Sequence, residues 1–297
     1  MITVLTPTYN RAYILVELYE SLMGQTDHDF IWMIVDDGST DGTGAFVEKW
    51  ENQKPPFKIV YLKKANGGKH RAVNYAVKRI KTEYTFIVDS DDRLTQNAIA
   101  CVKKWAKTIE KDRSFAGVAG LKGFCLNERI GDYPPGILPG GFIDADNRQR
   151  RKLCLTGDKA EVYRTEMLRR FPFPEYEGET FLSECVSYNR IADHGFKIRW
   201  FNEIIYLGNY IDDGLTKHIH ENRLKCFRGF TEETKSEIKA KGMIRYRMIG
   251  RYIQVAKEKG IGSRRIRKLL EISHFELVGG YIWHVLQTIA DTVRKRR

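Results

Sequence analysis

The chain has 297 residues, of which 42% are hydrophobic and 30% charged, and this composition is typical of a folded globular protein. It contains no run of about 18 uncharged apolar residues and no basic-then-apolar start, so we expect neither a membrane-spanning helix nor a secretory leader. Its five cysteines are odd in number and widely spaced, which argues against a disulfide framework or a cysteine zinc site.

The net charge of +12 lies almost entirely in the last quarter of the chain. Residues 1–220 contain 31 Lys/Arg and 30 Asp/Glu, whereas residues 221–297 contain 19 Lys/Arg and 8 Asp/Glu. A nearly neutral body with a basic segment of +11 predicts a localised contact with an anionic surface. A uniform basic surface would have favoured nucleic acid, and we expect no such partner.

Strand and helix patterns alternate through the first 120 residues. The predicted strands are residues 2–6, 30–35, 58–62 and 84–88, and the predicted helices are 14–23, 43–50, 72–80 and 98–109. Repeated strand–helix units predict an α/β fold with a mostly parallel sheet and helices on both faces. Ligands bind such sheets beyond the carboxyl ends of the strands. Polar clusters at 7–11, 36–41 and 89–92 follow three of these strands, so we expect them to meet at one edge.

The second half of the chain has a weaker pattern. Residues 121–157 are rich in Gly and Pro and predict a long excursion from the sheet. A strand is predicted over 158–164, a helix over 180–194, and two further strands over 197–201 and 204–210. After residue 221 the pattern predicts helices only.

Asp89, Ser90 and Asp91 directly follow a predicted strand. Alternate residues of an extended segment point the same way, so one carboxylate could face a ligand and the other a metal ion. A hard divalent cation prefers oxygen ligands. The alternative is a solvated turn that caps the next helix.

Two glycine-containing turns add candidate ligand contacts. Gly38 lets the backbone beside Asp37 approach a base or ribose closely, while capping of the next helix accounts for residues 39–43. Gly67 and Gly68 precede a predicted helix, where their amides suit an anion and Lys69 adds charge. An ordinary turn is the alternative there, because the full phosphate-binding loop pattern is missing.

Four motifs stand in a recognisable order: VLTPTYNR at 4–11, IVDDGSTDGT at 34–43, NGG at 66–68 and DSDD at 89–92. With them, the chain resembles the family 2 glycosyltransferases of the GT-A fold, of the type that builds bacterial polysaccharides. The resemblance is strong over residues 1–110 and looser to about residue 220.

The resemblance implies an inverting transferase that uses a nucleotide sugar and Mn²⁺ or Mg²⁺. Pro7 and Tyr9 would surround the nucleobase, Asp37 would bond to it, Asp89 would contact the ribose, and Asp91 would bind the metal ion. The full set of expected donor-binding residues is Pro7, Tyr9, Arg11, Asp37, Asn66, Lys69, Asp89, Ser90 and Asp91.

The general base is expected in the second half, where the family carries a Glu-Asp pair at the start of a helix. Here Ser183 stands at the glutamate position and Glu184 at the aspartate position, so Glu184 is the predicted base. A helix-capping charge is the alternative role for Glu184. Glu179 and Glu177 are the fallback candidates for the base.

Residues 210–218 close the predicted catalytic part. The resemblance suggests that His218 reaches the metal ion or the diphosphate, where it would add one nitrogen ligand to an oxygen-rich shell. An exposed loop histidine is the alternative interpretation, and His220 is a close competitor.

The C-terminal segment places apolar residues between basic clusters at 264–268 and 294–297. Gly279 and Gly280 predict a break between two helices. Basic flanks, Trp283 and an apolar face favour an interfacial helix on anionic lipid. Packing against the protein core and a homo-oligomer contact are the alternatives.

Together these features predict a metal-dependent inverting glycosyltransferase. It would move a sugar from a nucleotide-sugar donor, with UDP expected, to a glycan or lipid-linked acceptor in cell-surface polysaccharide synthesis. We expect a catalytic domain at 1–220, with a donor half (1–110) and an acceptor half (111–220), and a basic helical extension at 221–297. The expected location is the cytoplasm, peripheral at the inner face of the cell membrane. The alternatives are a nucleotidyltransferase and an inactive relative that serves as a membrane-bound assembly partner.

Overall fold

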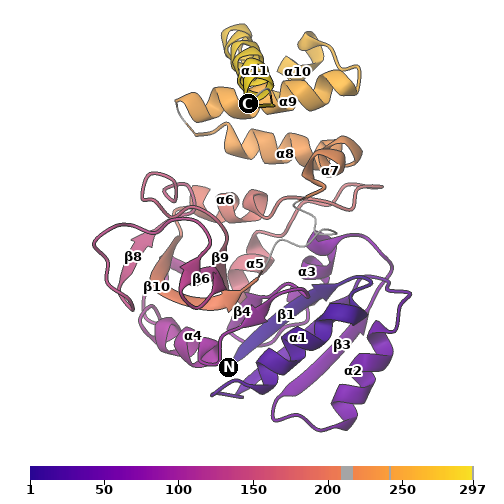
Figure 1. Cartoon of the computed structure of the whole chain (residues 1–297), viewed down its shortest axis with the longest axis vertical. Helices are drawn as coiled ribbons and strands as arrows, with labels where there is room; N and C mark the ends of the chain where they lie inside the picture. The colour runs from indigo at the N-terminus through magenta and orange to yellow at the C-terminus, as the bar shows by residue number, and fades with distance from the viewer. Residues whose placement is uncertain (209–216, 241, 296–297) are drawn as a thin grey trace. The chain divides into compact units, whose positions relative to one another are not determined.

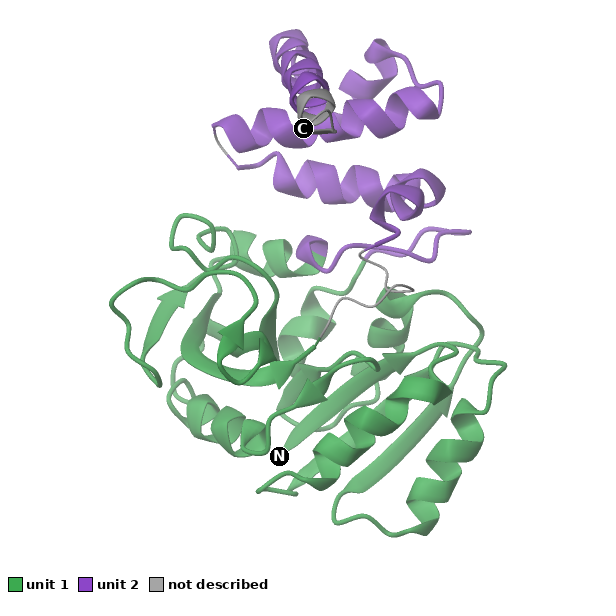
Figure 2. Ribbon diagram, viewed as in Figure 1, with its two compact units in different colours: residues 1–173, 187–210 green, residues 174–186, 211–297 purple. Residues whose placement is uncertain are grey.

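A computed structural model describes residues 1–208, 217–240 and 242–295 of the chain, with side chains described up to residue 290. The chain forms two units (Figure 2), each described here by itself. Unit 1 comprises residues 1–173 and 187–210, and unit 2 comprises residues 174–186 and 211–297. The domain boundary that the sequence predicts, at residue 220, stays a prediction.

The first four strands of unit 1 are parallel, as their alternation with helices predicted (Figure 1). They are β1 (Ile2–Thr8), β2 (Phe30–Asp36), β3 (Lys58–Lys63) and β4 (Tyr84–Ile87). Strand β1 lies between β2 and β4, and its last residue, Thr8, pairs with Asp36 at the end of β2. The carboxyl ends of these strands therefore lie at one edge of the sheet, where the polar motifs follow.

The second half of the sheet is mixed in direction. Its strands are β5 (Arg93–Leu94), β6 (Phe115–Cys125), β7 (Glu128–Arg129), β8 (Phe142–Ala145), β9 (Lys159–Arg164) and β10 (Lys197–Leu207). The strand order is β3-β2-β1-β4-β9-β6-β10-β5, with β7 paired to β6 and β8 to β10. The two strands predicted over 197–210 form the single strand β10, and residues 209–210 lie outside the described residues. The Gly- and Pro-rich excursion carries β7 and β8.

Helices cover both faces of this sheet. They are α1 (Ala12–Met23), α2 (Thr43–Asn52), α3 (Lys69–Val77), α4 (Ala98–Lys107), α5 (Thr165–Arg170) and α6 (Cys185–Asp193). Val4 and Trp32 share one apolar core with buried residues of α1, α2 and α4. Leu5 and Met33 alternate with them, so they point to the opposite face, where α3 contacts β1 and β2. The predicted α/β architecture with helices on both faces is confirmed.

Unit 2 is mainly helical, and its helices are α7 (Ile219–Lys225), α8 (Phe227–Glu237), α9 (Met243–Glu258), α10 (Ser263–Leu270) and α11 (His274–Lys295). It has a core of its own, in which Tyr252 and Ile249 of α9 pack with Ile266 of α10 and Leu277 of α11. The predicted C-terminal helical extension is therefore confirmed. Among the described helices, none combines the length and the apolar character needed to cross a bilayer.

The predicted break at Gly279 and Gly280 is wrong, because α11 continues through both residues. The two glycines allow α9 and α11 to approach closely. A Cβ atom on Gly280 would lie 2.3 Å from Cγ2 of Ile249, and one on Gly279 would lie 2.5 Å from the ring of Tyr246. Tertiary packing outweighs the helix cost of about 1 kcal/mol for each glycine.

Candidate active site

The loops after β1 and β2 are joined at the carboxyl edge of the sheet. The Asn10 amide donates to Oγ of Ser39 at 2.9 Å, and the Thr40 amide donates to Oδ1 of Asn10 at 2.8 Å. The Ala12 amide donates to Oδ2 of Asp41 at 2.9 Å. Two of the three polar clusters therefore meet, as the strand order predicted.

Two aspartates of the second cluster build its turn. The buried Asp36 accepts the Ser39 amide at 2.6 Å and the Tyr61 hydroxyl at 2.5 Å. Asp41 accepts the Thr43 amide at 3.1 Å, at the first residue of α2. The capping role predicted for residues 39–43 is consistent with these bonds.

Asp37 holds the loop that precedes α3. Its buried carboxylate accepts the Gly67 amide at 3.0 Å, the Gly68 amide at 2.6 Å, and Nζ of Lys64 at 2.6 Å. Gly38 has a φ of +89°, and a Cβ atom there would lie 2.8 Å from the Asn66 nitrogen. Asp37 and Gly38 thus shape residues 64–68, and a contact from Asp37 to a nucleobase stays a prediction.

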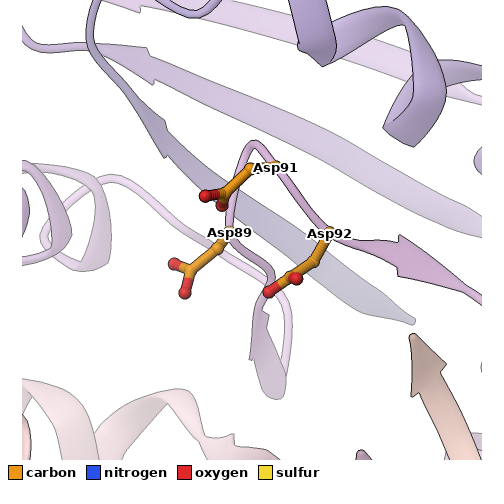
Figure 3. Close-up of side chains that lie close together, drawn as sticks. All are labelled: Asp89, Asp91 and Asp92. Carbon is orange, nitrogen blue, oxygen red and sulfur yellow. The ribbon is translucent and has the colours of Figure 1, made fainter. Parts of the chain in front are cut away.

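Three aspartates cluster in the segment that follows β4. Figure 3 shows the carboxylates of Asp89, Asp91 and Asp92 close together, and one oxygen from each lies within 4.8 Å of the others. Lysines pair with two of them: Nζ of Lys69 lies 2.5 Å from Asp89, and Nζ of Lys122 lies 2.8 Å from Asp92. Asp91 forms no ion pair within the described part of the chain.

The surroundings change the proton affinity of each carboxylate differently. Burial raises the pKa of Asp89, but the Lys69 ammonium outweighs burial and holds that pKa below its ordinary value. Burial and the charge of Asp89 raise the pKa of Asp91, against the opposing charges of Arg11 and Lys69. Burial and Asp89 also raise the pKa of Asp92 to about 6, although Lys122 lowers it. Strand β1 pairs in parallel with β4, with Leu5 beside Ile87, so the third polar cluster follows at the same edge of the sheet as the first.

Residues of β10 and β6 contact the acidic cluster. The Asp89 amide donates to the hydroxyl oxygen of Tyr206 at 2.9 Å. Gly208 lies close to the cluster, because a Cβ atom on it would lie 1.8 Å from Oδ1 of Asp92 and would require that carboxylate to move. Nζ of Lys122 also lies over the Tyr206 ring, 4.9 Å from its centroid. No sequence pattern singled out Lys122 or Tyr206, because both come from distant strands with no motif of their own.

The remaining donor-site candidates lie in unit 1 with different exposures. Pro7 is buried in β1, whereas the Tyr9 side chain is 48% exposed. Arg11 immediately precedes α1, and its guanidinium donates to the Tyr13 hydroxyl at 2.5 Å. Asn66 is exposed and Ser90 is buried. Their predicted nucleotide contacts stay predictions.

The donor set at 89–92 fits a hard divalent cation. Three carboxylates offer only oxygen ligands, which suit Mn²⁺ or Mg²⁺ better than softer metal ions. Asp91 is the carboxylate best placed to accept such an ion, because Lys69 and Lys122 already pair with its two neighbours.

The candidate bases belong to unit 2. Glu184 is half-buried and directly precedes α6. Glu179 accepts the Arg228 and Gly229 amides, each at 2.8 Å, and so caps the start of α8. Glu177 is exposed. The bonds of Glu179 give it a structural role, and the assignment of Glu184 as the base stays a prediction.

The two candidate histidine ligands also lie in unit 2. His218 is about half exposed, and its Nδ1 lies 3.8 Å from Glu221. His220 pairs with Glu258 of α9 at 3.0 Å. Residues 209–216, most of the segment predicted to close the catalytic part, lie outside the described residues. Metal binding by His218 stays a prediction.

Two solved structures resemble all or nearly all of the chain. Residues 1–349 of TarS from S. aureus, solved in complex with UDP-GlcNAc, match with a TM-score of 0.62 at 18% identity, covering 100% of this chain and 92% of that one. The mannosyltransferase PcManGT from Pyrobaculum calidifontis, solved with GDP-Man and Mn²⁺, matches with a TM-score of 0.58 at 16% identity, covering 96% and 86%. At these identities the likeness shows the fold, and the predicted GT-A architecture is confirmed.

Curated relatives match over shorter segments. Glycosyltransferase GlyG from Streptococcus pneumoniae is 34% identical over 112 residues, which are 38% of this chain and 36% of GlyG. Chondroitin synthase from Pasteurella multocida is 34% identical over 210 residues, 69% of this chain and 20% of the synthase. The matched segments thus span only a fifth to about a third of these relatives. The model of the family "Glycosyl transferase family 2" matches residues 3–170, more than half of the chain, and the chain belongs to this family.

Proposed function

We propose that the protein is a metal-dependent inverting glycosyltransferase that uses a UDP-linked sugar. The observation that carries the proposal is the acidic cluster at 89–92, in which Asp91 has no lysine partner among the described residues while Asp89 and Asp92 do. Relatives support the choice of donor and metal. TarS was solved with UDP-GlcNAc and PcManGT with GDP-Man and Mn²⁺.

The donor would bind along the carboxyl edge of β1, β2 and β4. Pro7 and the exposed ring of Tyr9 would flank the base. Asp37, which also holds the loop at 64–68, would contact the same base. Asp89 would contact the ribose. Arg11, Asn66, Lys69 and Ser90 would complete the contacts to the nucleotide.

Asp91 would hold Mn²⁺ or Mg²⁺, with His218 as a further ligand. When bound, such an ion offsets the negative charge that develops on the departing diphosphate. Lys69, which pairs with Asp89, would add a positive charge near the departing diphosphate.

Glu184 would remove the proton from the acceptor hydroxyl, whose oxygen then displaces the nucleotide in one step with inversion at the anomeric carbon. A glutamate can perform this transfer in place of the family's aspartate, provided that its longer side chain is held in position.

The acceptor would be a glycan or a lipid-linked sugar in cell-surface polysaccharide synthesis. The basic excess of residues 221–297 suits an anionic membrane surface, so we propose a cytoplasmic enzyme that is peripheral at the inner face of the membrane.

The test is a panel of nucleotide sugars. We expect UDP-sugars to raise the melting temperature in the presence of Mn²⁺, EDTA to remove that shift, and turnover to release UDP. A preference for GDP-sugars would overturn the choice of donor. Release of pyrophosphate would indicate a nucleotidyltransferase, and donor binding without hydrolysis or transfer would indicate an inactive relative.

A further inference from the structure

Helix α11 exposes a continuous apolar stripe. Six large side chains that recur at intervals of one, three or four residues are between 42% and 85% exposed: Phe275, Val278, Ile282, Val285, Leu286 and Ile289. At 100° per residue they fall within a stripe about 100° wide. Single exposed apolar residues are common on proteins, but six on one helix face mark an interaction surface.

The stripe faces outward because the other side of α11 packs against α9 and α10. Gly280 and Leu277 are buried in unit 2, and the Ser263 hydroxyl lies 2.8 Å from that of Tyr281. Arg245 of α9 forms an ion pair with Glu276. Because α11 is fixed to α9 and α10 in this way, the stripe cannot turn inward without breaking the core of unit 2.

The charges around the stripe identify its partner. Residues 277–290 contain no Asp, Glu, Lys or Arg, and Asp291 is then followed by the basic residues Arg294, Lys295, Arg296 and Arg297. Helix α10, which contacts α11, exposes four further basic side chains: Arg264, Arg265, Arg267 and Lys268. An apolar helix face beside exposed basic groups matches the interface of an anionic bilayer, which offers both hydrocarbon and negative charge.

We propose that the stripe of α11 inserts into the interfacial region of an anionic membrane, with α11 lying along the surface. From Phe275 to Ile289 the helix is about 21 Å long, enough to present all six side chains while lying flat. This inference deepens the membrane part of the proposed function by naming the surface that makes the contact.

A second copy of the chain would also cover an apolar stripe, but charge disfavours it. A two-fold interface brings the same surface of both copies together. Here that would bring the exposed basic side chains of α10 from both copies towards one another, and like charges facing each other destabilise a complex. The lipid surface carries the complementary charge, so it is the favoured occupant.

The test is co-sedimentation of the whole protein with vesicles of phosphatidylcholine containing about one third phosphatidylglycerol. We compare wild type with the double variant Ile282→Gln/Leu286→Gln, which keeps the net charge. The matched control is Leu126→Gln/Leu138→Gln in unit 1, which replaces two apolar residues that are at least as exposed. We expect the stripe variant to partition at least tenfold less well and the control to behave as wild type. We also expect wild type to bind pure phosphatidylcholine poorly.

Several outcomes would overturn the inference. Wild type could fail to sediment with anionic vesicles at low salt. Alternatively, the stripe variant and the control variant could lose vesicle binding equally. Wild type could also sediment as a dimer without lipid while the stripe variant is a monomer, which would make the stripe a self-association face. The UDP-dependent melting shift is measured on the same samples. If that shift persists while vesicle binding fails, the membrane inference fails alone, and if it is absent in wild type, the donor proposal fails instead.

Discussion

The strand-end loops of unit 1 bury charge, whereas helix α11 of unit 2 exposes a continuous apolar stripe. In unit 1, Asp37 and Asp92 are buried, and each has a lysine within 2.8 Å. In unit 2, α11 leaves six large apolar side chains in solvent. Both arrangements depart from the usual distribution, in which apolar groups are buried and charges are exposed.

The difference agrees with the proposal that the two units interact with different kinds of molecule. A buried, paired carboxylate costs desolvation energy, and in unit 1 these carboxylates shape the loops where a charged ligand is expected. An exposed apolar stripe costs solubility, and in unit 2 it adjoins basic groups that suit a lipid surface. Substitutions in each unit can show whether the chemistry belongs to unit 1 alone or to both units.

The largest expected effect is that of Asp91→Ala. Because the proposed metal ion stabilises charge by several kcal/mol, turnover should fall by about 10³-fold. The melting temperature should barely change, since Asp91 forms no ion pair among the described residues. The measurements are UDP release and thermal unfolding.

EDTA provides the control for Asp91→Ala. Chelation should reduce wild-type turnover to the level of the variant, and added Mn²⁺ should restore only the wild type. Wild-type activity that is unchanged in EDTA would overturn the metal assignment whatever the variant does.

Glu184→Gln tests whether unit 2 contributes to the chemistry. The variant keeps the shape of the side chain but removes its proton affinity. Transfer should fall by about 10²–10⁴-fold, the usual contribution of a general base. Donor binding, measured by the UDP-dependent melting shift, should stay near wild type.

Glu179→Gln is the matched control, because Glu179 caps α8 through two amides. It should lower the free energy of unfolding by about 1 kcal/mol and leave transfer largely intact. Normal transfer in Glu184→Gln together with its loss in Glu179→Gln would show that the base is misassigned.

Lys122→Met tests the buried ion pair of unit 1. Removing the ammonium leaves the Asp92 carboxylate buried without a partner, which should cost about 3 kcal/mol of unfolding free energy at pH 8. The pKa of folded Asp92 is raised to about 6, so the folded state binds more protons than the unfolded state between the ordinary value of an aspartate, about 4, and about 6. Stability therefore falls as pH rises through this range, and loss of Lys122 extends the fall to higher pH.

Denaturant unfolding of Lys122→Met in EDTA at pH 5 and pH 8 measures this effect. We expect a smaller loss at pH 5, where Asp92 can take up a proton. In Lys103→Met the partners Asp27 and Asp29 are partly exposed, so the loss should be about 1 kcal/mol or less at both pH values. An equal loss at both pH values in Lys122→Met would contradict the account.

Much of unit 1 was predictable because its signals are local. Each of its first four strands is a short apolar run, and the polar motifs follow directly in the sequence. Parallel pairing then brings the strand ends together, so the meeting of residues 7–11 with 36–41 required no further information. The acidic cluster was predictable for the same reason, because its three aspartates directly follow the apolar run of β4.

Other parts depend on contacts that no local pattern encodes. Lys122 reaches Asp92 from β6, and Tyr206 contacts Asp89 across 117 positions of the sequence. The bonds of Asp37 to Gly67 and Gly68 depend on how two loops meet. The glycine pair in α11 predicted a break by its intrinsic preference, whereas packing against α9 made it part of a helix.

Gly280→Ala tests that packing, and its expected effect on stability is smaller than that of Lys122→Met. Alanine is the better helix former by about 1 kcal/mol, so an isolated α11 would gain stability. In the protein the new Cβ atom would lie 2.3 Å from Cγ2 of Ile249, and overpacking of this kind costs about 1–3 kcal/mol. We therefore expect a net loss of up to about 2 kcal/mol, measured by denaturant unfolding. The double variant Gly280→Ala/Ile249→Ala removes the opposing methyl group, so the two substitutions should cost less together than the sum of their separate losses. A stabilised Gly280→Ala would show that α9 and α11 pack less closely than the structure indicates, and the fixed outward orientation of the apolar stripe would lose its explanation.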